Sequence, residues 1–177
     1  MKIHLEVRLR LAILFLAFAS TIAAAAVPDE DAIARLYQRA VMGDKSAVEE
    51  CISSLEAAVK AQPANQLARA YLGSAYTLRS RDMGFGPAKL TALRQGLATM
   101  DQAVAAAPED ARVRLVRART TDALPAILGR KQSTRDDFAW LAKAAARSPD
   151  KFSRDDLATI REHVSPRGNL DTPAPSR

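Results

Sequence analysis

Few side chains in this sequence could do chemistry. His163 is the only histidine after residue 4, and Cys51 is the only cysteine. A lone histidine near the C-terminal end of a predicted helix more often interacts with the helix dipole than acts as a base. A single cysteine excludes an intramolecular disulfide, and Cys51 falls on the apolar side of a predicted helix, where a buried thiol is ordinary. We therefore expect neither catalysis nor metal binding from these two residues.

Two further patterns share features with known kinds of site. Segment 84–87, Gly-Phe-Gly-Pro, has two glycines of a phosphate-binding loop, but it lacks a preceding strand and a Lys-Ser/Thr end, so we interpret it as a turn. The acid pairs Asp136/Asp137 and Asp155/Asp156 lie at predicted helix starts, where acids stabilise the helix dipole. A hydrolase that uses carboxylates alone stays an alternative, although nothing places two acids opposite each other. We predict a protein that is not an enzyme and has no cofactor and no bound metal.

The first 26 residues have the pattern of a secretory signal peptide. A basic start, an apolar run and small residues for a signal peptidase make up this pattern, namely Lys2, Arg8 and Arg10, residues 11–19, and residues 24–26. We expect cleavage after Ala25 or Ala26, and hence a periplasmic or secreted protein with no stable membrane span after cleavage. An uncleaved anchor is the alternative, because residues 11–27 are almost wholly apolar and reach the short limit of a spanning helix.

Residues 27–165 must then form the domain, and their pattern is helical nearly throughout. Apolar residues recur at spacings of three and four, which is the period of an amphipathic helix. The predicted helices lie between residues 29 and 43, 44 and 62, 66 and 79, 87 and 107, 111 and 124, 136 and 147, and 153 and 165. The fourth of these is expected to bury Leu90, Leu93, Leu97, Met100 and Val104. Residues 166–177 are expected to be a disordered tail.

Three features of the sequence predict specific details of these helices. Segment 112–119 alternates arginine with apolar residues, which alone would indicate a strand. We choose a helix, because segment 108–110, Pro-Glu-Asp, is a typical helix start and no second strand exists to pair with it. Gly73, in the middle of a helix, costs about 1 kcal/mol relative to alanine, so we expect a neighbouring helix to pack closely there. Ser153 and Asp156 are expected to cap the last helix.

One segment matches most of a known repeat signature. Residues 69–76, Arg-Ala-Tyr-Leu-Gly-Ser-Ala-Tyr, followed by Gly96, Met100, Ala103 and Pro108, match most of W-x2-L-G-x2-Y…A-x3-F…P, with Arg69 in place of the tryptophan. The same alanine–proline spacing recurs in Ala58 and Pro63 and in Ala144 and Pro149. The sequence from about residue 32 to residue 149 thus resembles the tetratricopeptide repeat family. Its units exceed the about 34 residues of that repeat, and the excess lies at 81–90 and 126–132.

The resemblance implies an all-α fold of antiparallel helix pairs, stacked as a short α-solenoid of about three units. A generic helical bundle is the alternative. In the family, the first helix of each pair lines a concave groove that usually holds another protein. Carried onto this sequence, this implies partner contacts at Leu67, Tyr71, Ser74, Leu78, Arg112 and Arg119. Tyr71 and Tyr76 could instead be core residues.

The basic residues suggest what such a groove would bind. Arg112 and Arg119 could fork onto a carboxylate of a partner's tail, whereas in the alternative the arginines of 112–119 are solvated or paired with Asp110 and Asp122. The formal net charge of +6, with the excess of bases after residue 63, also favours an acidic partner or an anionic surface, unless it is only a solvated surface. Nucleic acid is disfavoured by the predicted export and by an aromatic content of 5%.

We therefore predict an exported scaffold or adaptor that holds another protein or peptide in its groove. The alternative is a small periplasmic helical bundle that binds a lipid or another small molecule between its helices. The first prediction requires an open groove, and the second requires a closed apolar cavity of roughly a few hundred Å³.

Overall fold

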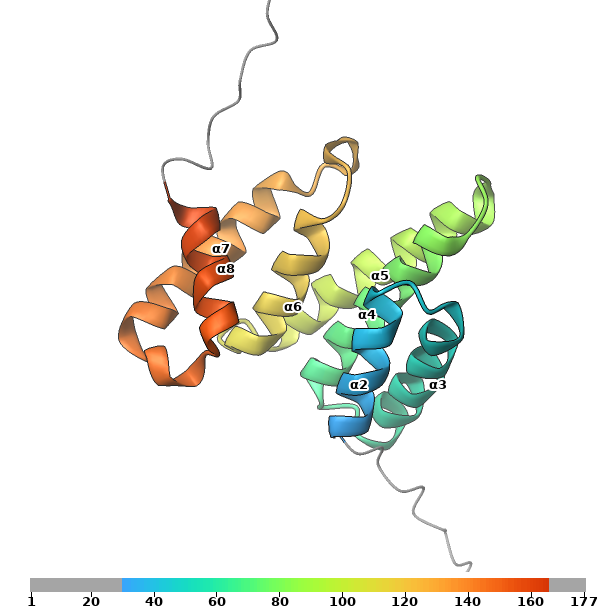
Figure 1. Cartoon of the computed structure of the whole chain (residues 1–177), viewed down its shortest axis with the longest axis horizontal. Coiled ribbons are helices and arrows are strands. Elements are labelled where there is room, and N and C mark those ends of the chain that lie inside the picture. The colour runs from blue at the N-terminus through green and yellow to red at the C-terminus, as the bar shows by residue number, and fades with distance from the viewer. Residues whose placement is uncertain (1–29, 166–177) are drawn as a thin grey trace, which may run out of the picture.

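The computed structural model describes residues 30–165, and every regular element in this range is helical (Figure 1). The α-helices are α2 (Glu30–Val41), α3 (Lys45–Ala61), α4 (Gln66–Asp82), α5 (Pro87–Ala106), α6 (Ala111–Asp122), α7 (Lys131–Arg147) and α8 (Arg154–Val164), and the short 3₁₀ helices are η1 (Ala126–Leu128) and η2 (Pro149–Lys151). The predicted all-α fold class is therefore confirmed. The predicted signal peptide at 1–26 and the predicted tail at 166–177 lie outside the described residues.

Polar side chains determine where several of these helices begin. Asp44, Asn65 and Asp110 each accept a backbone N–H from the first turn of the helix that follows. Ser153 and Asp156 form the predicted capping box of α8, in which each side chain accepts the backbone N–H of the other residue at 3.1 Å. Because a cap stabilises a helix by about 1 kcal/mol, these short polar segments are strong helix starts.

The basic segment 112–119 lies in helix α6, as predicted, and not in a strand. The prediction for the next helix was less accurate, because α7 begins at Lys131, more than a turn before the predicted start at Asp136. Residues 131–135 are all polar, so apolar periodicity carries no signal there. The earlier start places Asp137 in the second turn of α7, and the prediction that it lies at a helix start is wrong.

Helices α4 and α5 pack closely against each other, and two glycines allow this approach (Figure 1). A Cβ atom on Gly73 would lie 2.7 Å from the carbonyl oxygen of Gly96, and a Cβ atom on Gly96 would lie 2.5 Å from the carbonyl oxygen of Gly73. Both distances are too short for real Cβ atoms. The close helix contact predicted from Gly73 is therefore confirmed.

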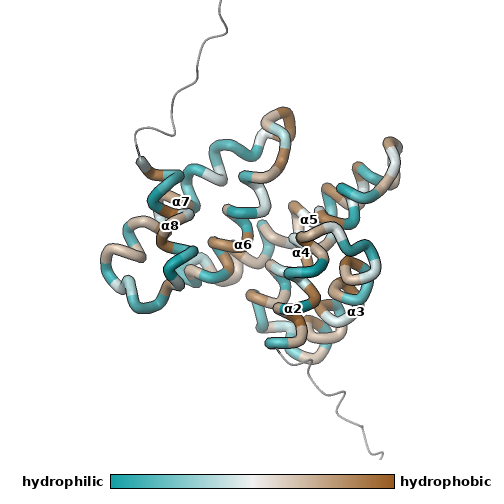
Figure 2. The backbone as a smooth tube through the Cα atoms, in the orientation of Figure 1, coloured by the Kyte–Doolittle hydropathy of each residue, from teal (hydrophilic) through white to brown (hydrophobic). Residues whose placement is uncertain are grey.

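The buried apolar side chains form successive clusters along the molecule. One joins α2, α3 and α4, the next joins α4, α5 and α6, and a third joins α6, α7 and α8. Apolar and polar residues are interspersed along the helices (Figure 2), and the middle of α4 is buried on every side, from residue 72 to residue 77. Because neighbouring clusters share α4 and then α6, these two helices connect the core from one end to the other.

The predicted apolar stripe of α5 is buried from Leu93 to Val104, but the prediction for Leu90 is wrong, since that side chain is 47% exposed. The end of α4 and the start of α5 form a projecting hairpin tip, drawn in green in Figure 1. Phe85 within this tip is fully exposed, whereas Arg81 at the end of α4 donates hydrogen bonds to the carbonyl groups of Ala40 and Val41 of α2. Periodicity shows which side of a helix is apolar, whereas burial also requires a neighbour.

Helix α4 occupies the centre of the arrangement, because it contacts α2, α3, α5 and α6. Helix α6 in turn contacts α4, α5 and α7, and α8 packs against α7. Figure 1 shows α6 between the group α2–α5 and the pair formed by α7 and α8. The first helices of the three predicted pairs, α2, α4 and α6, thus contact each other in chain order.

Candidate partner-binding groove

Two adjoining clefts lie where α2, α4 and α6 meet. The larger has a volume of about 540 Å³ and also reaches α3, and the smaller has a volume of about 200 Å³ and also reaches α8. Both clefts are lined by Tyr37 of α2, Tyr71 of α4, and Arg112 and Arg119 of α6. We name the two clefts together the groove.

The groove is apolar toward α2 and α3 and cationic toward α6. Its larger cleft has apolar lining from Ile33, Ala34, Leu55, Ala58, Leu67 and Ala68. Its remaining polar lining, besides the tyrosines and arginines, comes from Asp31, Gln38, Gln62 and Asn65. Asp31, Gln38 and Gln62 are exposed, so this cleft is open to solvent.

Four of the six residues predicted to contact a partner line the groove, namely Leu67, Tyr71, Arg112 and Arg119. Tyr71 is only partly buried, and its ring meets the ring of Tyr37 edge to face, with 4.8 Å between ring centroids. Tyr71 therefore contributes both to the core and to the groove. Tyr76, the other tyrosine proposed for the core, is only 6% exposed.

The prediction of Ser74 as a contact residue needs correction. Its side chain is 1% exposed, and its Oγ lies 2.7 Å from the Tyr37 hydroxyl and 2.8 Å from Thr120 Oγ1. Ser74 thus links α4 to α2 and α6 behind the groove, where a partner cannot reach it. Burial raises the pKa of Tyr37, and the hydrogen bond with Ser74 offsets part of this rise.

Leu78 does not line the groove either. Its partly buried side chain packs against the cluster of α2, α3 and α4. Leu78 lies one turn beyond Ser74 on α4 and is partly exposed, but it is outside the lining of both clefts. We therefore remove Ser74 and Leu78 from the set of contact residues.

The arginines of α6 divide into two pairs. Arg112 and Arg119 border the groove, whereas Arg114 and Arg117 hold the buried carboxylate of Asp137 from α7. Arg112 is exposed, and its guanidinium makes no hydrogen bond or ion pair with any residue between 30 and 165. The first pair is therefore placed for binding, and the second is part of the packing between α6 and α7.

The alternative pairing of these arginines with Asp110 and Asp122 is wrong. Asp110 caps α6 by accepting the backbone N–H groups of Arg112 and Val113. Asp122 pairs with His163, whose Nε2 lies 2.9 Å from its Oδ2. The two acids are thus engaged elsewhere, and carboxylates from other helices pair with Arg114, Arg117 and Arg119, whereas Arg112 is exposed.

Helix α8 contributes to the groove, which sequence reasoning missed. Arg119 Nη2 lies 2.9 Å from Asp156 Oδ1 and donates a hydrogen bond to Thr159 Oγ1 at 3.2 Å. Asp156 also lines the smaller cleft. No short-range pattern predicts this contact, because α7 and two turns separate α6 from α8. Tyr37 was also not predicted as a groove residue. Its position on the first helix of the first predicted pair was the signal that could have indicated it.

His163 attaches the other end of α8 to its neighbours. Besides Asp122, its ring contacts the Thr159 carbonyl through Nδ1 at 2.8 Å and stacks on Phe138 with 4.0 Å between centroids. Both polar partners are acceptors, so both are satisfied only when the ring is doubly protonated. Burial lowers the pKa of His163, but the hydrogen bonds to Thr159 and Asp122 raise it more, and the net shift is upward.

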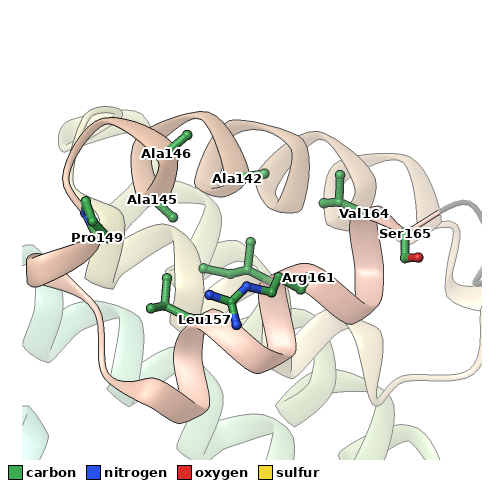
Figure 3. Close-up of a pocket in the computed structure, with 9 residues that line it drawn as sticks. Ala142, Ala145, Ala146, Pro149, Leu157, Arg161, Val164 and Ser165 are labelled. Atoms are coloured by element: carbon green, nitrogen blue, oxygen red, sulfur yellow. The ribbon is translucent and has the colours of Figure 1, made fainter.

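A third cleft, of about 410 Å³, lies between α7 and α8 (Figure 3). Figure 3 shows alanines of α7 on one side and Leu157, Arg161 and Val164 of α8 on the other. Its lining is mainly apolar, with Arg161 as its charged side chain.

The remaining candidates for chemistry are the Cys51 thiol and groups of metal-ligating side chains. Burial raises the pKa of the Cys51 thiol to about 11, so this thiol is protonated and unreactive near neutral pH.

Residues 30–165 contain no group of three or more His, Cys, Asp or Glu side chains that could hold a metal ion. None of the helices in this part of the chain combines the length and the apolar character needed to cross a membrane.

Comparison with known proteins yields no family model, no curated protein and no solved structure that matches this chain. The clefts and the side chains that line them are therefore the features of this chain that indicate a function. Of the three clefts, the two that form the groove combine aromatic rings, apolar surface and arginine.

Proposed function

We propose that this chain is an exported, non-catalytic scaffold or adaptor with a tetratricopeptide-like stack of helix pairs, and that it holds a partner polypeptide in the groove. The observation that carries this proposal is the convergence of Tyr37, Tyr71, Arg112 and Arg119 from three helices on adjoining clefts. Tyrosine provides a large contact area with little loss of side-chain entropy, and arginine recognises carboxylates with two parallel hydrogen bonds.

The order of helix contacts supports the stacked arrangement. Helices α2 and α4 contact each other, as do α4 and α6, and these are the first helices of successive predicted pairs. In a stack of helix pairs, the first helices form one continuous surface. The groove lies on the surface where these three helices meet.

The two ends of the groove indicate the chemistry of the partner. Its apolar end, at Ile33, Leu55 and Leu67, suits aliphatic side chains, and its cationic end, at Arg112 and Arg119, suits carboxylates. Arg112 offers five N–H donors with no partner among the described residues. We infer a partner segment in which acidic residues lie next to apolar ones.

A selection from random peptides tests this proposal. Displayed peptides would be selected on the purified protein and on its Arg112→Glu variant, with Arg94→Glu as the matched control. Arg94 is exposed on α5 and does not line the groove. We expect enrichment of peptides that combine aliphatic and acidic residues on the wild type and on Arg94→Glu, and loss of these peptides on Arg112→Glu.

Truncation of one charged hot-spot residue weakens binding by about 2 kcal/mol or more, which corresponds to roughly thirtyfold. Calorimetry with an enriched peptide would measure this change. Enrichment that survives Arg112→Glu, or no enrichment over a blank surface, would rule out binding in the groove.

Export is the part of the proposal that rests on the sequence alone. Residues 1–26 supply a basic start, an apolar run and small residues before the proposed cleavage site. N-terminal sequencing of the protein recovered from the periplasm or medium should begin at Ala26 or Val27. Recovery only in the membrane fraction with Met1 retained would support the uncleaved anchor instead.

A second candidate function is the binding of a small amphiphile, and the cleft between α7 and α8 favours it. The volume of about 410 Å³ falls in the range of small-molecule sites, and Arg161 could pair with an anionic head group. Ala146→Trp would fill this cleft, whereas Ala139→Trp, on an exposed position of α7, would not. Binding of a fluorescent fatty acid that is lost only in Ala146→Trp would favour this function.

A further inference from the structure

Of the two arginines that line the groove, Arg119 already forms an ion pair with a carboxylate of the same chain. Arg119 and Asp156 form an ion pair at 2.9 Å, and both side chains line the smaller cleft. Arg112 lines the same cleft and has no such partner among residues 30–165. The cationic end of the groove is thus half occupied by an acid of α8.

The Asp156 carboxylate is held in place by two different groups. Its Oδ1 faces Arg119, whereas its Oδ2 accepts the Ser153 N–H of the capping box at 3.1 Å. The capping box orients the carboxylate toward the groove independently of Arg119. If another carboxylate replaced Asp156 as the partner of Arg119, Asp156 would therefore keep its hydrogen bond from the Ser153 N–H and its place in α8.

We propose that Asp156 is an internal ligand of the groove, and that an acidic partner binds by displacing it from Arg119. This inference rests on the proposed function and adds regulation to it. A partner carboxylate must then contact Arg112 and Arg119 together, or gain apolar contacts as well, in order to compete with the internal acid. A simple monovalent anion gains neither advantage.

The exposure of the pair makes the exchange feasible. The side chain of Arg119 is 43% exposed and that of Asp156 is 21% exposed, so water can solvate both groups during the exchange. Ion pairs of this kind are weak, which keeps the internal ligand displaceable. The rest of α8 need not move, because Ile160 is buried against α6 and α7 and His163 holds the last turn.

The test uses the neutral variant Asp156→Asn, whose amide oxygen can still accept the Ser153 N–H. Asp155→Asn is the matched control, because Asp155 is an exposed acid in the same turn that does not line the groove. Both variants change the net charge equally. The probes are a fluorescein-labelled peptide with two leucines followed by two aspartates, and its counterpart with asparagines in place of the aspartates.

Fluorescence anisotropy of the full chain should show that Asp156→Asn binds the acidic peptide about two- to fivefold more tightly than the wild type. The asparagine peptide should bind all variants equally, and Asp155→Asn should behave as the wild type. In an Arg119→Gln background, Asp156→Asn should have no effect, since the competition is then absent. Thermal unfolding would establish that each variant is folded.

Equal gains for Asp156→Asn and Asp155→Asn would show a general charge effect and overturn the inference. Unchanged affinity of Asp156→Asn for an acidic peptide that binds the wild type would overturn it while the proposed function stands. If the wild type binds neither peptide, the proposed function is rejected together with the inference.

Discussion

Asp137 is a fully buried carboxylate that depends on two arginines of the neighbouring helix. Arg114 Nη1 and Arg117 Nη2 donate to its Oδ1 at 2.8 and 2.9 Å, and Arg117 Nε donates to its Oδ2 at 2.8 Å. Arg114 also lies over the ring of Trp140, at 4.7 Å from its centroid. A buried charge is tolerated when ionic and hydrogen-bonding partners surround it, and here they come from α6 and α7 together.

Replacing this single carboxylate should therefore destabilise the fold. We expect Asp137→Asn to lower the free energy of unfolding by about 3 kcal/mol, because it leaves buried arginine charge without its partner. Arg117 keeps its contact with Asp101, which limits the loss. The control Asp136→Asn alters an exposed acid and should stay within about 0.5 kcal/mol of the wild type. Urea unfolding measures the free energy of unfolding of both variants. Equal stability of the two would contradict the role of Asp137 as the buried partner of Arg114 and Arg117.

At the scale of helices, the contact between α4 and α5 requires that two glycines face each other. The atoms nearest to an added Cβ at Gly96 are the Gly73 carbonyl oxygen and Thr77 Cγ2, at 2.5 and 2.7 Å. Because the first of these is backbone, the helices themselves would have to move apart. The groove depends on this contact indirectly, since α4 lies at its centre.

Gly96→Ala should thus destabilise the protein although alanine is the better helix former. The gain in helix propensity is about 1 kcal/mol, and overpacking typically costs about 1–3 kcal/mol, so we expect a net loss of about 1 kcal/mol. Gly84→Ala is the control, because a Cβ there meets no atom within 4 Å and its φ is not positive. Thermal or urea unfolding should place Gly84→Ala at or slightly above the wild type. A Gly96→Ala variant as stable as this control would disprove the close contact.

For the molecule as a whole, His163 should make stability depend on pH. Its pKa in the folded state lies above the ordinary value of 6.5, since the hydrogen bonds to Thr159 and Asp122 outweigh burial. Its stabilising contribution is therefore fully present below pH 6.5 and is lost as the pH rises through the folded-state pKa. The ring is partly exposed, so we expect a contribution below about 1 kcal/mol.

Unfolding free energies measured between pH 5 and pH 9 would check this expectation. The wild type should lose stability relative to His163→Gln as the pH rises, and Asp122→Asn should reduce the difference because it removes the acidic partner. A pH-independent difference between wild type and His163→Gln would show that the ring contributes by packing on Phe138 alone.

Helix caps and helix starts depend on residues that are neighbours in the sequence, so local patterns predicted them. The helix start at Asp110, the cap at Ser153 and the helix over 112–119 follow from such patterns and are confirmed. The early start of α7 escaped prediction because residues 131–135 contain no apolar residue. The groove was predicted at Leu67, Tyr71, Arg112 and Arg119 through the repeat resemblance, whereas the contribution of Tyr37 and the extension of the groove to α8 were not predicted.

The sequence by itself determined that residues 30–165 fold into helices, where most of these helices begin, and that α4 must receive a close neighbour at Gly73. Helix periodicity, capping and the small size of glycine all act over short distances along the chain. Only the tertiary structure decided that Ser74 is enclosed while Tyr37 is open to the groove, that Asp137 is buried, and that Asp156 reaches Arg119. These outcomes depend on which helices meet and at what angle, and packing between residues far apart in sequence determines this.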